Sequence, residues 1–244
     1  MKLKTTVLAL LLAGASFAQI QFPQVSSKAK VDQTIGLTNI EVDYSRPNLN
    51  NRVAFGGIVP FGEIWRTGAN VNTTIALDTD VLVEGKPLYK GKYALYSKPN
   101  EKSWDLIFYK VTDNWGNPKK WDENNVALKV TVPTTKLNDK VESFTIGFED
   151  VTTNGGNLAL AWDQTKVKAN VAVPTQQLVI RSIETNLNEN SPSRDFYGAA
   201  NYYYNNQLDL IKAAQWINTA IEKEQNAPQF YLDLRTKIMG ATKK

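Results

Sequence analysis

The stretch FGGIVPFGEIWRTGANVNTT, residues 55–74, is the segment around which we expect the fold to be organised. It combines glycines, a proline, three aromatic residues, an arginine and two asparagines, a mixture that is too irregular for a plain strand or helix. Glycine lets the backbone turn tightly and approach other groups closely, and such loops on a rigid scaffold often carry binding residues. The stretch therefore predicts a shaped loop on an all-β domain, facing a ligand.

The residues before this stretch alternate in polarity. In 38–45, Ile40, Val42 and Tyr44 alternate with polar residues, and 31–36 precedes them across Gly36. A period of two is typical of a half-buried strand, and the Arg46-Pro47 pair ends it because proline cannot donate to a ladder.

Short segments with the same character follow the stretch. Glycine, proline and asparagine separate them, which favours an antiparallel β-sandwich or barrel-like domain over residues 19–174. We expect a long polar loop at 112–125 and a hairpin turn at 163–165. The expected strands are 73–77, 81–84, 93–96, 104–109, 126–132, 144–148, 158–162 and 167–173.

The pattern changes after Pro174, because the apolar spacing of residues 175–244 lengthens to that of helices. Helices are expected from 178 to 187, 195 to 204, 208 to 224 and 228 to 239, with Ser191 as a cap before Pro192. Part of this region resembles one tetratricopeptide-like hairpin. Such modules need about three repeats to stand alone, so we expect a C-terminal helical cap, with a protein-docking face as the alternative.

Composition removes several classes of chemistry. The 244 residues include no cysteine and no histidine, which excludes thiol nucleophiles, typical zinc sites and histidine acid–base catalysis. No cofactor and no metal site is expected. The formal charge of +4 is small, so nucleic-acid binding is not expected either.

Residues 1–18 have the features of a secretory signal peptide. Lys2 and Lys4 precede a short apolar run, and Ser16-Phe17-Ala18 is a small-x-small cleavage site. The run is shorter than the roughly 20 residues that cross a bilayer. We therefore expect cleavage after Ala18, a secreted or periplasmic protein, and no membrane span after cleavage.

The sequence contains a distinctive set of motifs: DYSRP at 43–47, GGxVPFG at 56–62, WRTGAN at 65–70, GxYAL at 91–95 and Trp104. Together these motifs resemble a known family of secreted bacterial proteins, the domain-of-unknown-function family 2911. The resemblance covers roughly residues 25–173 and implies no established activity.

The candidate ligand-binding residues centre on WRTGAN. Trp65 offers a ring for stacking, Arg66 a planar fork of donors for a carboxylate, phosphate or diol, and Thr67 and Asn70 further hydrogen bonds. Asp43 and Arg46 join them if the strand that ends at Arg46 lies beside the loop. The alternative is that these side chains serve only the architecture, as a core plug and an ion network.

Trp115 is a further binding candidate, because with Trp121 it lies among acidic and amide residues, an arrangement suited to sugar rings. The alternative is that both rings anchor the loop. Paired carboxylates would indicate a glycoside hydrolase, but sequence cannot place two of them together. The candidates for such a pair are Glu41, Asp43, Glu63, Asp105 and Glu149.

The sequence thus predicts a non-catalytic binding or envelope-accessory protein for a small polar ligand, glycan or peptide. The alternatives are a carbohydrate-active hydrolase with paired carboxylates, and a protein–protein interaction module that docks through the C-terminal helices.

Overall fold

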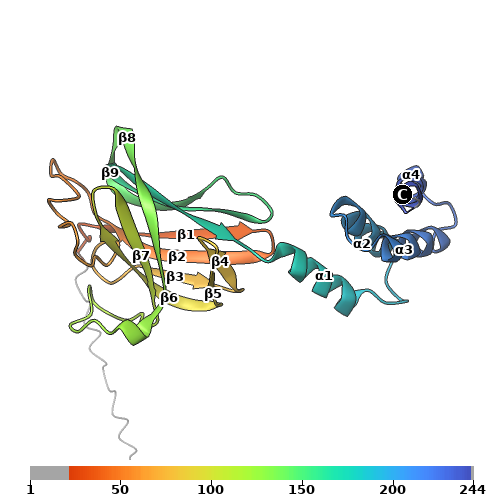
Figure 1. The fold of residues 1–244 in the computed structure, drawn as a ribbon, viewed down its shortest axis with the longest axis horizontal. Coiled ribbons are helices and arrows are strands. Elements are labelled where there is room, and N and C mark those ends of the chain that lie inside the picture. The colour runs from red at the N-terminus through yellow and green to blue at the C-terminus, as the bar shows by residue number, and fades with distance from the viewer. Residues whose placement is uncertain (1–21, 243–244) are drawn as a thin grey trace, which may run out of the picture.

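A computed structural model describes residues 22–242 of the chain, so the predicted signal peptide 1–18 and its cleavage site lie outside the described residues. Nine strands come first, and four helices follow (Figure 1). The predicted mainly β fold with C-terminal helices is confirmed. The strands are β1 (Ser27–Ile35), β2 (Thr38–Arg46), β3 (Thr74–Leu77), β4 (Val81–Val83), β5 (Lys86–Leu88), β6 (Gly91–Pro99), β7 (Ser103–Tyr109), β8 (Val126–Glu149) and β9 (Gly155–Ala172).

All nine strands belong to one antiparallel sheet in the order β1-β2-β3-β6-β7-β8-β9-β4-β5. The sheet does not close, so β1 and β5 are its edges. The short β5 was not predicted. It pairs with β4 across a two-residue turn in which Glu84 and Gly85 both have positive φ.

The sheet curls because β8 is long enough to run from β7 to the far end of β2. Its second half meets the chain just after β2: the N–H of Phe144 donates to Pro47 O (2.9 Å), and an isolated bridge joins Asn48 to Ser143. The Tyr44 hydroxyl also donates to Ile146 O (3.3 Å). These contacts bring the two halves of the curled sheet together around a common core.

Two details of the strand prediction are wrong. Segments 126–132 and 144–148 form one strand, and so do 158–162 and 167–173. The expected hairpin turn at 163–165 is absent, because only Asp163 takes a left-handed conformation (φ 53°) while the ladder continues on both sides of it. Such a single irregular residue is typical of a β-bulge.

Aromatic rings fill the core at the end of the sheet where residues 47–73 lie. Trp65 stacks on Trp162 with ring centroids 5.8 Å apart, and Phe55 meets Trp104 edge-on at 4.5 Å. All four side chains are buried together with Phe144. Residues 55–74 thus form an irregular loop, as predicted, and it closes this end of the core.

The helices are α1 (Thr175–Asn186), α2 (Ser193–Asn205), α3 (Leu210–Glu222) and α4 (Gln229–Ala241). Figure 1 shows them extending from the end of β9 away from the sheet. Their buried residues form a hydrophobic cluster of their own, centred on Ile217 and Ile238. The start of α1 is tied to the β part by Thr175, whose hydroxyl donates to Thr153 O (2.5 Å).

The helix boundaries agree with the prediction to within about three residues, but the predicted cap of α2 is wrong. That helix begins at Ser193, and Pro192 precedes it without a side-chain cap, so Ser191 is not the N-cap. No helix of residues 22–242 is both long enough and apolar enough to cross a membrane.

Candidate functional site

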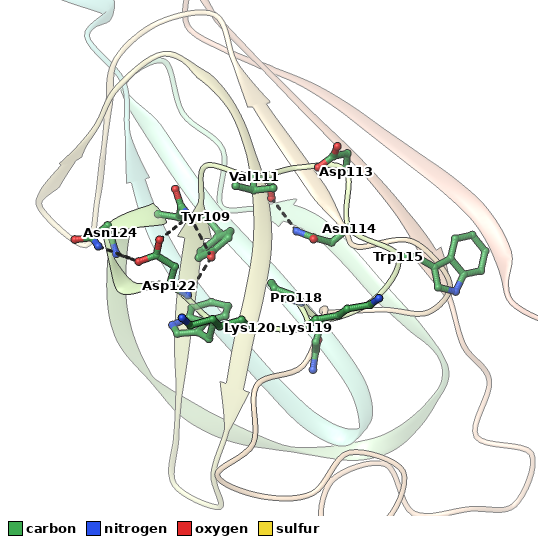
Figure 2. Close-up of a pocket in the computed structure, with 13 residues that line it drawn as sticks. Tyr109, Val111, Asp113, Asn114, Trp115, Pro118, Lys119, Lys120, Asp122 and Asn124 are labelled. Atoms are coloured by element: carbon green, nitrogen blue, oxygen red, sulfur yellow. Dashed lines mark hydrogen bonds between the residues drawn. The ribbon is translucent and has the colours of Figure 1, made fainter.

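Residues 47–73 and 110–125 lie at the end of the sheet away from the helices (Figure 1). Side chains of these two segments line most of two hollows. We call the smaller one, about 400 Å³, the arginine pocket; its lining includes Arg52, Ile58, Glu63, Arg66 and Asn117. The larger one, about 860 Å³, is the loop pocket, formed by residues 109–125 (Figure 2). Asn117 lines both hollows, so they are neighbours.

Trp65 and Thr67 belong mainly to the architecture. The Trp65 indole N–H donates to Gly68 O (2.9 Å), and its ring is buried among the core aromatics, with only part of it reaching the arginine pocket. The Thr67 hydroxyl is fully buried and lies 3.0 Å from Ser97 Oγ, its hydrogen-bond partner. The hydroxyl group of Thr67 therefore makes its hydrogen bond within the protein.

Arg46 and Asn70 also bond within the chain. Arg46 donates to Phe144 O (3.0 Å) and to Thr145 Oγ1 (2.7 Å), which ties the end of β2 to β8. Asn70 donates to Ser26 O (3.3 Å) and to two neighbouring side chains. Asp43 lies on β2, next to the edge strand β1, in register with Lys30 and Thr74. The predicted convergence of Asp43, Arg46 and Arg66 gives no ion pair among these described residues.

Arg66 differs from its neighbours because its charge is not matched. It is partly buried, its Nε is buried without a hydrogen-bond partner, and it takes part in no ion pair within residues 22–242. Its guanidinium lines the arginine pocket and also supports the loop pocket, since a methyl group added at Gly116 would lie 2.8 Å from Nη1. Gly116 has φ +85°, so both its backbone and its contact with Arg66 favour glycine.

Sequence reasoning missed Arg52, which also lines the arginine pocket. It named Glu63, which lines the same pocket, only as a possible member of a carboxylate pair. Arg52 donates from Nε to Leu49 O (2.9 Å) and from Nη2 to Asn48 O (3.0 Å), leaving Nη1 without a partner among the described residues. The available signal was its position, directly before the glycine-rich stretch. Residues 48–52 include turn-forming residues, a composition typical of a plain turn.

Hydrogen bonds with residues 55–74 and with β6 fix the polar loop at 110–125. Asn72 donates from its backbone to Asn114 O (3.2 Å) and from its side chain to Thr112 O (3.2 Å). Asn117 donates to Ile64 O (2.6 Å), and the Tyr96 hydroxyl donates to Gly116 O (3.2 Å). Burial raises the pKa of Tyr96, which keeps this hydroxyl a donor.

The two loop tryptophans have different environments. Trp121 packs on Tyr109, with centroids 4.5 Å apart and planes tilted by 31°, and meets Tyr96 edge-on. Trp115 is 74% exposed and lies at the opposite end of the loop from Tyr109 (Figure 2). The anchoring interpretation therefore fits Trp121, whereas Trp115 stays available to a ligand.

The carboxyl groups do not single out an acid catalyst. Lysine side chains that bond to Glu41 and Glu149 lower the pKa of each, and Lys168 with Asn157 does the same for Asp150. Across 22–242, no cluster of three or more acidic residues is placed to hold a metal ion.

The helical region contains closely packed aromatic rings. Tyr203 and Trp216 meet edge-on at 4.7 Å. Tyr203 and Tyr231 are almost fully buried in the helical cluster, so these rings form its core. A protein partner for the helices stays a prediction.

The fold and the two hollows thus define a mainly β protein whose loops form candidate binding sites at one end of a curled sheet. The chain belongs to the family described as "Protein of unknown function (DUF2911)", whose model matches residues 26–171. This confirms the resemblance drawn from the motifs. No curated protein and no solved structure matches the chain.

Proposed function

We propose that the protein is a non-catalytic binding protein whose arginine pocket holds a small polar ligand with an anionic group and an apolar part. The observation that carries the proposal is the unmatched charge of Arg66. A partly buried guanidinium without a counter-ion is costly, and an anionic ligand would supply the missing partner. Its planar fork of donors suits a carboxylate or a phosphate.

The rest of the pocket fits such a ligand. Arg52 and Arg66 against Glu63 leave a net positive lining, while Pro47, Ile58 and other apolar residues supply the walls. A volume of about 400 Å³ lies in the range of small-molecule sites, about 300–1,000 Å³. An organic acid, an acidic sugar or the carboxylate end of a short peptide has this combination of charge and size.

A hydrolytic function receives less support. Paired-carboxylate catalysis needs an acid whose pKa is raised. The carboxyl groups with resolved shifts among the described residues, Glu41, Glu149 and Asp150, all have lowered pKa values. We therefore propose binding rather than hydrolysis. The expected signal peptide implies that this binding takes place outside the cytoplasm.

Calorimetric titration with phosphate, citrate, glucuronate and alanyl-alanine tests this proposal, comparing the wild type with Arg66→Gln. At least one of these ligands should bind, and Arg66→Gln should weaken it by about tenfold or more, as for loss of a charged hydrogen-bond pair. Arg66→Lys should restore only part of the affinity, because lysine keeps the charge but not the fork.

Arg194→Gln is the matched control. Arg194 lies on α2, is largely exposed, and contacts only the neighbouring Asp195 (3.5 Å). The Arg194→Gln variant should bind the ligand with the affinity of the wild type. The proposal is wrong if no anion binds, or if a bound anion keeps its affinity in an Arg66→Gln protein that remains folded by circular dichroism.

A further inference from the structure

Hydrogen bonds within the protein fix the conformation of the loop pocket without a ligand. Hydrogen bonds from Asn72, Tyr96 and Asn117 fix its backbone at separate points, and the N–H of Lys110 donates to Asn125 O (2.9 Å) at its base. Asp122 also accepts from the backbone N–H of Asn124 (3.0 Å), which closes a short helical turn. A loop of this length that is fixed so closely loses little conformational entropy when it binds.

The same loop leaves hydrogen-bonding groups unused. Asp113, Lys119 and Lys120 make no side-chain hydrogen bond and no ion pair with any other residue of the described chain. Figure 2 shows Asp113 and Lys119 on the stretch of loop that leads to Trp115. The hollow thus offers both free acceptors and free donors, together with an exposed indole ring.

We propose that the loop pocket is a binding site for the uncharged sugar rings of an oligosaccharide. Each sugar hydroxyl both donates and accepts hydrogen bonds, so it can use Asp113 and the lysines together. The C–H face of a sugar ring can pack on Trp115, which removes exposed apolar surface from water. This site goes beyond the arginine pocket and does not depend on an anionic ligand.

Charge and size decide between ligand classes. The two lysines are balanced by Asp113 and Asp122, so the lining is neutral and does not favour a polyanion. The volume of about 860 Å³ lies near the upper end of the range for small-molecule sites, about 300–1,000 Å³. We therefore expect a neutral oligosaccharide of more than one ring.

The test is calorimetric titration of the whole mature chain with neutral trisaccharides: cellotriose, maltotriose, mannotriose and tri-N-acetylchitotriose. Tri-galacturonate serves as the charged comparison. At least one neutral trisaccharide should bind with a dissociation constant below about 10 mM. Trp115→Ala should weaken it by about tenfold or more, as for a central aromatic contact, and Trp115→Phe should restore most of the affinity. Asp113→Asn should also weaken binding, because a charged acceptor is lost.

Tyr89→Ala is the matched control for loss of an exposed ring. Tyr89 is 67% exposed, lies in the β part outside both hollows, and bonds to Tyr93 only through its backbone oxygen. This variant should bind the trisaccharide like the wild type. Since Trp115 is largely exposed, its variants should keep the wild-type melting temperature.

The proposal is overturned if no neutral trisaccharide binds, if only tri-galacturonate binds, or if Trp115→Ala and Asp113→Asn leave the affinity unchanged. Its fate is separate from that of the arginine pocket. Failure of every small anion to bind, with trisaccharide binding that depends on Trp115, would refute the proposed function and support this one.

Discussion

Thr67 shows how side chains that suggest a ligand can instead serve the fold. Its φ of 55° is unusual for a β-branched residue, and such a backbone persists only where the surroundings hold it. Its hydroxyl meets Ser97 Oγ (3.0 Å), and its carbonyl oxygen accepts from Thr73 Oγ1 (2.6 Å). The polar groups of WRTGAN therefore fix the shape of the loop that carries Arg66.

Thr67→Val should lower the free energy of unfolding by about 1–3 kcal/mol, because it leaves the buried Ser97 hydroxyl without its partner. Ser97→Ala should also destabilise the protein. The double variant should be less destabilised than the sum of the two, since it removes both partners. Urea unfolding of the four proteins measures this coupling, and strictly additive effects would contradict the assigned bond.

The sequence identified a loop that lines a hollow, but not which of its side chains lack partners within the protein. Trp65, Thr67 and Arg46 find partners such as Ser97 and Phe144, which are distant in sequence and reach them only because β6 and β8 fold alongside. Arg66 and Trp115 were predicted for the same reasons and do lie at the hollows. Local chemistry does not distinguish these cases, because long-range pairing decides which donors are already used.

At the scale of elements, the β8–β9 ladder spans a longer stretch of its strands than any other pairing in the sheet, from Thr134 to Glu149 on β8. Glu149 on β8 bonds with two lysines of β9: its carboxylate oxygens lie 2.6 Å from the Nζ atoms of Lys166 and Lys168. These bonds hold the pKa of Glu149 below the ordinary glutamate value of 4.5. The lowered pKa means that the native state favours the ionised carboxylate.

Glu149→Gln should therefore destabilise the protein near neutral pH, by less than about 1 kcal/mol because Glu149 is partly exposed. Since the folded-state pKa is lowered, this stability is present above pH 4.5 and is lost as the pH falls through the lowered value. Urea unfolding down to about pH 3 should show the variant and wild type converging.

Glu101→Gln is the comparison for this prediction, because Glu101 is exposed and makes no ion pair in the part of the chain that the structure covers. It should match the wild type at every pH. A Glu149→Gln deficit that persists at the lowest pH would contradict an electrostatic origin.

The presence of most strands was predictable, because apolar and polar residues alternate in a strand that has one buried face. Strand length was not, because residues 133–143 continue β8 with mostly exposed polar side chains, and no apolar period marks them. The same absence of a pattern hid the bulge at Asp163.

At the scale of the molecule, residues 22–242 contain a large β core, a small second cluster in the β part around Tyr96 and Tyr109, and a helical cluster. The β core and the helical cluster share no buried residue, and α1 connects them. The change of period after Pro174 predicted where the helices begin, at Thr175. The separation itself was not predictable, because an apolar helical face does not reveal whether it packs on a sheet or on other helices.

We expect the β core and the helical cluster to unfold independently. Ile217→Ala should destabilise the helices by about 2–5 kcal/mol and leave the β transition unchanged, and Leu160→Ala should do the reverse. Tryptophan fluorescence reports mainly the β part, since Trp216 is the only one of six tryptophans in the helices. Helical circular dichroism reports the rest. Coincident shifts of both signals in either variant would show one cooperative unit instead.

The open sheet has a consequence for contacts between copies of the protein at high concentration. An edge strand of nine residues, such as β1, presents a row of backbone groups that another molecule can extend into a fibre. Exposed Lys28, Lys30 and Asp32 line this margin, and adding a strand there would strip water from their charges. We therefore expect the charged side chains of β1 to disfavour pairing of this edge with a second copy of the chain.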